Sequence, residues 1–192
     1  ICVDLHWALL REGRLRRDFT ADMLNRRRRL GDLWMLGAED AMFVLLVHSA
    51  FAKHLAGWDM GLHRVMDIVE WLRTQDCDWQ MVRTELEQNG VQTAAWATLR
   101  WVQLLSSSHT LPRLDEMLAD IRPGRLREAW LDAWLRNNLP ARTSSMHWAR
   151  LSGFTMLLHD TVGDSARAVA GRCRARRRSS DDLAVFQGLG DQ

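Results

Sequence analysis

The stretch LGAEDAMFVLLVHSAFAKH, residues 36–54, predicts one long helix around which the rest of the chain is arranged. Glu39 and Asp40 stand in its first turn, where carboxylates interact favourably with the positive end of the helix dipole. Lys53 and His54 stand in its last turn, near the negative end. Nearly every residue between these two pairs is apolar, so the helix is apolar on almost every face. A helix of this kind is covered by other helices, and we expect a bundle around it.

The composition is that of an ordinary globular protein. The 192 residues are enough for one domain with its own core, and 47% of them are hydrophobic and 26% charged. The formal net charge of +2 gives no general attraction for nucleic acid, so we expect nucleic-acid binding to be weak or missing. The longest apolar run, about 12 residues, is shorter than the roughly 20 that a membrane-spanning helix needs, so we expect no membrane partner.

The cysteines and the first residue bear on where the protein works and how complete it is. Cys2, Cys77 and Cys173 are odd in number and far apart, which argues against a disulfide framework or a zinc site. This pattern, with no visible signal peptide, favours a reducing, cytoplasmic location. Because the chain begins at Ile1 and runs directly into a strand-like segment, we expect it to be the C-terminal fragment of a longer protein.

Periodicity predicts a fold that is mainly α. The odd-numbered residues of 1–10 are apolar, which predicts a half-buried strand with Asp4 on its other face. Asp78 suits the N-cap of a later helix, and Gly90 suits the residue just after its end. Including that helix, the expected helical segments are 36–54, 62–74, 78–90, 94–105, 114–121, 124–138 and 146–162. The fold class is therefore a bundle of six to eight helices preceded by a terminal strand.

The polar residues of the central helix point in different directions. At 100° per residue, His48 and Lys53 lie about 140° apart around the axis, so a straight helix cannot aim both at one small ligand. His48 lies in an apolar stripe, which favours a core histidine with hydrogen-bonded ring nitrogens. Lys53 lies near the helix end, where it can reach solvent or a cleft. Asp67, on the next helix, is either a partner of Lys53 or His54 or a surface acid.

Several short motifs occur in a fixed order along the first half of the chain: Val3-Asp4-Leu5-His6-Trp7, Glu39-Asp40, His48, Lys53-His54, Asp67-Ile68 and Asp78-Trp79. Together they resemble a poorly characterised bacterial nucleotidyltransferase family of the polymerase-β-like superfamily. The resemblance covers roughly residues 3–112, and the set in this order is more specific than any single motif. It implies that the predicted first strand is a terminal strand of a nucleotidyltransferase α/β domain.

The resemblance also implies an activity and a set of site residues. Members would transfer a nucleotidyl group from an NTP to an acceptor, here unknown, with two divalent metals, Mg²⁺ or Mn²⁺. Asp4 would then be a catalytic, metal-holding carboxylate, although the residues alone also allow an exposed strand acid paired with an arginine. Lys53, His54 and Asp67 would lie at the NTP, with the helical part closing over the triphosphate.

One departure from the family pattern affects the expected activity. The catalytic opening of such enzymes, a Gly-Ser turn followed by paired Asp residues, lies upstream of the segment that holds Asp4 and has no counterpart here. We therefore expect the chain alone to be inactive. The expected division is 1–35 as the end of a catalytic domain with a connector, 36–166 as a helical domain, and 167–192 as a basic, flexible tail. No aromatic residue is interleaved with the arginines of that tail, so we expect no specific nucleic-acid site there.

Two other functions remain open from the residues. The chain could be a non-catalytic helical interaction module. Arg142 and His147 also match the spacing of helical HEPN ribonucleases, although a chain with 25 arginines and seven histidines gives roughly two or three such matches by chance. The run Arg26–Arg29 suits phosphate binding through guanidinium groups, or it is a solvated surface.

Overall fold

A computed structural model describes residues 9–51, 61–106, 111, 113–137 and 148–188. Its elements, in chain order, are α1 (Thr20–Asn25), β1 (Arg28–Leu30), β2 (Leu33–Met35), α2 (Ala38–Phe51), α3 (Gly61–Thr74), α4 (Trp79–Asn89), α5 (Gln92–Leu105), α6 (Leu114–Asp120), α7 (Arg125–Asn137), α8 (Trp148–Leu157) and α9 (Val162–Gly188). The predicted mainly α class is confirmed. The strand predicted for 1–10 falls almost wholly on residues outside the described ranges.

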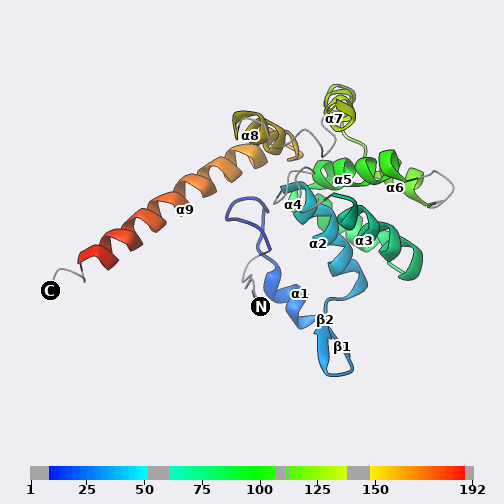
Figure 1. Ribbon diagram of the computed structural model, residues 1–192, viewed down its shortest axis with the longest axis horizontal. Coiled ribbons are helices and arrows are strands. Elements are labelled where there is room, and N and C mark those ends of the chain that lie inside the picture. Colours follow the sequence, from blue (N-terminus) through cyan, green and yellow to red (C-terminus); the bar gives the residue numbers. More distant parts are fainter. Residues whose placement is uncertain (1–8, 52–60, 107–110, 112, 138–147, 189–192) are drawn as a thin grey trace.

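The predicted central helix is confirmed as α2, which packs against α3, α4 and α5 (Figure 1). Met42, Phe43 and Leu46 are fully buried, and the α5 residue Thr98 donates a buried hydrogen bond of 2.7 Å from its Oγ1 to the Leu46 carbonyl. The helix is not covered on every side, however. Its outer face is only half-buried, and together with α3 it lines a groove that includes Val44 and Leu45.

The predicted ends of α4 are both confirmed. The Asp78 carboxylate accepts hydrogen bonds from the backbone N–H groups of Gln80 (2.9 Å) and Met81 (3.3 Å), so it caps two of the free donors at the helix start. Gly90 adopts a left-handed conformation with φ of 67° and ends the helix.

A β-hairpin that the sequence analysis did not predict lies between α1 and α2. Its strands pair antiparallel with Arg28 opposite Met35 and Leu30 opposite Leu33, and Gly31 takes a positive φ of 60° in the turn. Every residue of both strands is exposed, and the hairpin projects from the bundle (Figure 1).

The single apolar helix predicted for 146–162 is wrong in its described part, because the chain breaks there into α8 and α9. Thr161 stands just before α9, and its Oγ1 accepts a hydrogen bond from the Asp164 N–H (3.1 Å) while donating one to the Asp164 carboxylate (2.6 Å). These reciprocal bonds begin a new helix at this point. The predicted boundary after residue 166 falls inside α9, which extends away from the bundle (Figure 1). The three-part division stays a prediction.

The apolar side chains of α7 do not all face the bundle. Leu126 is 91% exposed, whereas Leu131 is fully buried. The two residues are five apart, which places their side chains about 140° apart around the helix axis. Trp134, which is nearly in line with Leu131, stacks on Phe154 of α8 with ring centroids 5.0 Å apart, so an aromatic contact joins α7 to α8.

None of the helices within the described ranges is long and apolar enough to cross a membrane.

Candidate functional site

Two acidic residues of the sequence motifs hold the bundle together. Glu39 Oε1 accepts a hydrogen bond of 3.3 Å from the Asp78 backbone N–H, which links the start of α2 to the start of α4. Asp40 is 2% exposed and accepts two hydrogen bonds from Arg26, one of them from Nε at 3.1 Å. Arg26 Nη2 also donates to Glu85 of α4 at 2.8 Å. Both motif carboxylates therefore form hydrogen bonds that connect parts of the fold.

The tryptophan of the Asp-Trp motif is structural as well. Trp79 is largely buried, and its Nε1 donates a hydrogen bond of 2.9 Å to the Asp120 carboxylate at the end of α6. This bond satisfies the indole N–H and ties α4 to α6. His48 is half-buried on α2, and its assignment as a hydrogen-bonded core histidine stays a prediction.

Most of the predicted site residues lie outside the described ranges. This is so for Asp4, Lys53 and His54, and also for Arg142 and His147 of the ribonuclease alternative. Asp67 is described. Its side chain is 53% exposed, accepts from the Arg64 guanidinium at 3.5 Å, and lines the groove between α2 and α3. The structure therefore does not test whether these residues form one site, and the described residues contain no group of three or more side chains suited to a metal ion.

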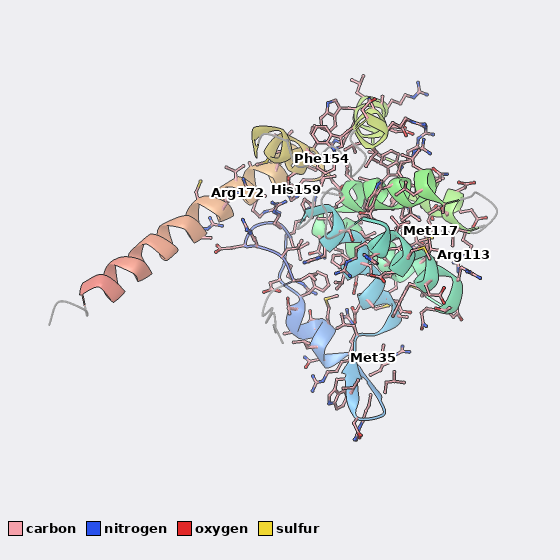
Figure 2. All side chains as sticks on the ribbon, viewed as in Figure 1. Met35, Arg113, Met117, Phe154, His159 and Arg172 are labelled. Atoms are coloured by element: carbon pink, nitrogen blue, oxygen red, sulfur yellow. The ribbon has the colours of Figure 1, made fainter. Side chains whose placement is uncertain are left out.

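The end of α2, two residues before Lys53 in the sequence, is surrounded by a buried polar cluster. We call Arg14, Phe51, His159, Asp164 and Arg167 the α2-end cluster. The Arg14 guanidinium lies 4.8 Å from the centroid of the Phe51 ring, and the His159 ring lies 4.7 Å from it. Arg14 is 6% exposed and His159 is 1% exposed. A guanidinium cation and an imidazole therefore both contact the Phe51 ring in a place shielded from water. Figure 2 labels His159 at the junction of α8 and α9.

Several donor and acceptor atoms of this cluster are buried without a hydrogen-bond partner in the described part of the chain. They are Arg14 Nη1, Arg167 Nη1 and both ring nitrogens of His159. Burial lowers the pKa of His159 to about 4, with nearby Arg14 adding to the effect, so the ring is neutral at pH 7. Burial, with Arg172 and Arg11 nearby, also lowers the pKa of Arg14 to about 10. Arg14 nevertheless remains charged at neutral pH.

The counter-charge in the cluster is Asp164, and its carboxylate is already fully engaged. It accepts from Arg16 Nε at 2.9 Å and Nη2 at 2.8 Å, from Arg167 Nη2 at 2.7 Å, and from the Thr161 hydroxyl at 2.6 Å. The hydrogen bonds from Arg16 hold the pKa of Asp164 well below its usual range. One carboxylate thus faces several guanidinium groups, which leaves a positive excess around the end of α2.

Glycines allow the segment before α1 that carries Arg11, Arg14 and Arg16 to lie directly on α9. We call this segment the arginine-bearing loop. Gly13 has a φ of 82°, and a Cβ there would lie 2.6 Å from the Arg167 carbonyl oxygen. A Cβ on Gly171 would overlap the Glu12 carbonyl. Gly90 is constrained in the same way, since a Cβ would lie 2.7 Å from both the Arg16 Nε and the Asp164 Oδ2 atoms. The close approach of the two backbones therefore depends on Gly13 and Gly171, whereas Gly90 leaves room for the side chains of Arg16 and Asp164.

A basic cavity of about 350 Å³ lies between this loop and α9. Its charged lining residues are the arginines Arg11, Arg16, Arg167 and Arg174 and the acids Glu12 and Asp18. Glu12 is paired with Arg174 at 2.9 Å, and the Asp18 carboxylate accepts from Thr20. Guanidinium groups in excess over acids suit a phosphate-bearing ligand.

The segment between α8 and α9 positions much of this cluster, and the sequence did not predict that a connecting segment lies there. The Asp160 carboxylate accepts from the backbone N–H groups of Gln92 (3.0 Å) and Thr93 (2.7 Å), so it caps the start of α5. Arg127 Nη1 donates to the carbonyls of His159 (3.0 Å) and Asp160 (2.8 Å) and fastens the segment to α7. The only local signal was the Thr-x-x-Asp spacing before α9.

The family comparison identifies the class of protein: the chain belongs to a family described as uncharacterised nucleotidyltransferases, whose model matches residues 1–107. The resemblance inferred from the motifs is confirmed. No curated protein and no solved structure matches the chain. His159, Asp164 and Arg167 lie beyond the matched residues, so the family match covers only the first part of the α2-end cluster.

Proposed function

We propose that this protein binds an NTP through the basic end of α2 and takes part in nucleotidyl transfer to an acceptor that is not yet identified. The observation that carries the proposal is the family match over residues 1–107. It is supported by the buried Arg14 guanidinium, which lies 4.8 Å from the ring centroid of Phe51, the last described residue before Lys53 and His54. An NTP carries several negative charges, so the guanidinium groups around this end of α2 would attract it, whereas Glu39 and Asp40 at the start of the helix would repel it.

Within this proposal, Lys53 contacts the β- or γ-phosphate of the NTP. A compact ammonium group binds phosphate as a point charge and needs no bidentate geometry. His54 and Asp67 are proposed to contribute to the same NTP site, with Asp67 orienting a cation and not meeting phosphate directly, because two negative groups would repel. The exposed position of Asp67 in the groove between α2 and α3 leaves its carboxylate free to turn toward such a cation.

A divalent metal supplies charge neutralisation to nucleotidyl transfer, and the described residues do not by themselves fit such a site. The candidate ligand on this chain is Asp4, for which we propose a metal-holding role. One carboxylate is a poor match for the oxygen-rich coordination of Mg²⁺ or Mn²⁺ in these enzymes. We therefore propose that the chain binds NTP but does not transfer its nucleotidyl group alone.

This proposal is tested by giving the purified chain each common NTP, labelled on the α-phosphate, with Mg²⁺ or Mn²⁺ and a cell extract as the source of acceptors. Equilibrium dialysis should detect bound NTP that inorganic tripolyphosphate displaces, because the phosphates carry the recognition. No label should be transferred to the extract above the level seen without the chain. Transfer by the chain alone would show that Asp4 is not a lone carboxylate, and the lack of any NTP binding would contradict the proposed function.

A further inference from the structure

A second cavity, of about 300 Å³, lies where α2, α3, α4 and α6 meet. Its apolar walls are formed by Met42, Leu72, Trp79, Leu111, Leu114 and Met117. Five of these six side chains are buried and Leu72 is half-buried, so the walls belong to the core. A hollow of this size and lining is at the lower end of the range for small-molecule sites.

The charges at this cavity are of one sign. Among the described residues that line it, the only charged side chains are the exposed Arg73 and Arg113. Neither guanidinium has a hydrogen bond or ion pair within the described part of the chain. Three acids lie near the cavity-lining Cys77 without lining the cavity themselves: Asp78 caps α4, Glu39 accepts from the Asp78 N–H, and Asp76 is exposed. Two unpaired cations beside an apolar hollow indicate a ligand with an apolar body and a single negative end.

We propose that this cavity binds an apolar monocarboxylate, such as a medium-chain or aromatic acid, with its carboxylate held by Arg113 and Arg73. At roughly 30 Å³ for each non-hydrogen atom, the space fits about ten such atoms. Octanoate has this size. A guanidinium group binds a carboxylate in a bidentate manner, and the buried methionines Met42 and Met117 adapt to the shape of an apolar chain.

This site is separate from the proposed NTP site and does not depend on it. Figure 2 labels Arg113 and Met117 at the α6 side of the bundle, whereas His159 lies at the junction of α8 and α9 and Arg172 lies on α9. The contributions from α6 also lie beyond the residues that match the family model. Failure of NTP binding would therefore leave this proposal standing, and the reverse also holds.

Cys77 provides a direct probe, because its free thiol lines the cavity. A protein carrying Cys2→Ser and Cys173→Ser keeps this thiol as its single cysteine. Octanoate bound in the cavity should slow alkylation of Cys77 by a maleimide by about tenfold or more, since the ligand would block access to the thiol. 1-Octanol and octylammonium have the same apolar body with a neutral or positive end, and they should protect far less at the same concentration.

Matched variants separate the anion site from a merely apolar hollow. Arg113→Met should weaken octanoate protection by about tenfold, which corresponds to the loss of one charged hydrogen bond, and Arg73→Met should weaken it in the same direction. Arg125→Met removes an exposed arginine that lies away from this cavity and should change nothing. Equal protection by octanoate and octanol, equal effects of the Arg113 and Arg125 variants, or no protection at all would each overturn the proposal.

Discussion

At the scale of single residues, Arg14 is a buried cation with no hydrogen-bond partner on Nη1 in the described part of the chain. Its folded pKa of about 10 is lower than the ordinary value of 12.5, so below pH 10 the charged form costs stability. The contact with the Phe51 ring offsets only part of that cost. A buried charge that lowers the stability of the fold is typical of a position that binds a ligand. Arg14, at the end of α2, is such a charge.

We therefore expect Arg14→Met to stabilise the free protein by about 1 kcal/mol, because methionine keeps an apolar stem without the buried charge. Urea unfolding at pH 7 measures this change, and Arg125→Met serves as the exposed control with a change below about 0.5 kcal/mol. With saturating ATP the order should reverse, since the wild-type protein gains more from the ligand. A lower unfolding midpoint for Arg14→Met without ligand would show that the guanidinium stabilises the folded protein.

His159 should make the fold sensitive to mild acid. Its folded pKa of about 4, caused mainly by burial and next by Arg14, is below the ordinary value of 6.5. Stability is therefore fully present above pH 6.5 and is lost as the pH falls toward 4, with a loss of about 2 kcal/mol already at pH 5. The engaged carboxylate of Asp164 titrates only below this window, because its pKa is lowered too.

The variant His159→Phe keeps the ring stacked near Phe51 and removes the titrating group. Its free energy of unfolding should change little between pH 6.5 and 5, whereas His63→Gln, at an exposed position, should retain the wild-type slope. Urea unfolding at several pH values gives the comparison. Equal slopes for the wild-type protein and His159→Phe would mean that another group controls the acid response.

At the scale of elements, the contact between the arginine-bearing loop and α9 can be broken by one methyl group. Alanine normally stabilises a helix relative to glycine by about 1 kcal/mol. On Gly171 the added Cβ would overlap the Glu12 carbonyl, so Gly171→Ala should instead destabilise the protein by roughly 1–3 kcal/mol.

Gly153→Ala on α8 is the matched control, because no atom lies within 4 Å of a Cβ built there, and it should stabilise the protein by about 0.5–1 kcal/mol. Thermal unfolding of both variants tests the pair. If Gly171→Ala is as stabilising as Gly153→Ala, the loop does not lie on α9 as described.

Elements were predictable where local pattern and tertiary packing agree. The capping residues Asp78 and Gly90 on α4 are local signals, and both appear in the structure as predicted. The break after α8 was not predicted, although the polar residues His159, Asp160 and Thr161 separate Leu158 from Val162. It depends on Asp160 capping α5 from a position 67 or more residues away in the sequence.

At the scale of the whole molecule, sequence identified the family but not the α2-end cluster. Glu39 and Asp40 belong to the motifs that carry the family resemblance. In the structure, however, they bond to Asp78 and Arg26 and stabilise the fold. In the cluster, Arg14 and His159 both contact Phe51. These three residues are far apart in sequence, and no local pattern predicts such contacts. The family match ends at residue 107, so α9 carried no functional expectation beyond its basic charge.

In the proposed function, the end of α2 holds the triphosphate of an NTP through Lys53. The most direct measurement is the affinity for ATP, by isothermal titration, of the wild-type protein, Lys53→Met and the control Arg125→Met, with the unfolding midpoint of each. Lys53→Met should weaken ATP binding by about tenfold or more, or roughly 1.4 kcal/mol, with little change in the midpoint. A Lys53→Met protein that is less stable but whose folded fraction binds ATP as well as the wild type would contradict the claim.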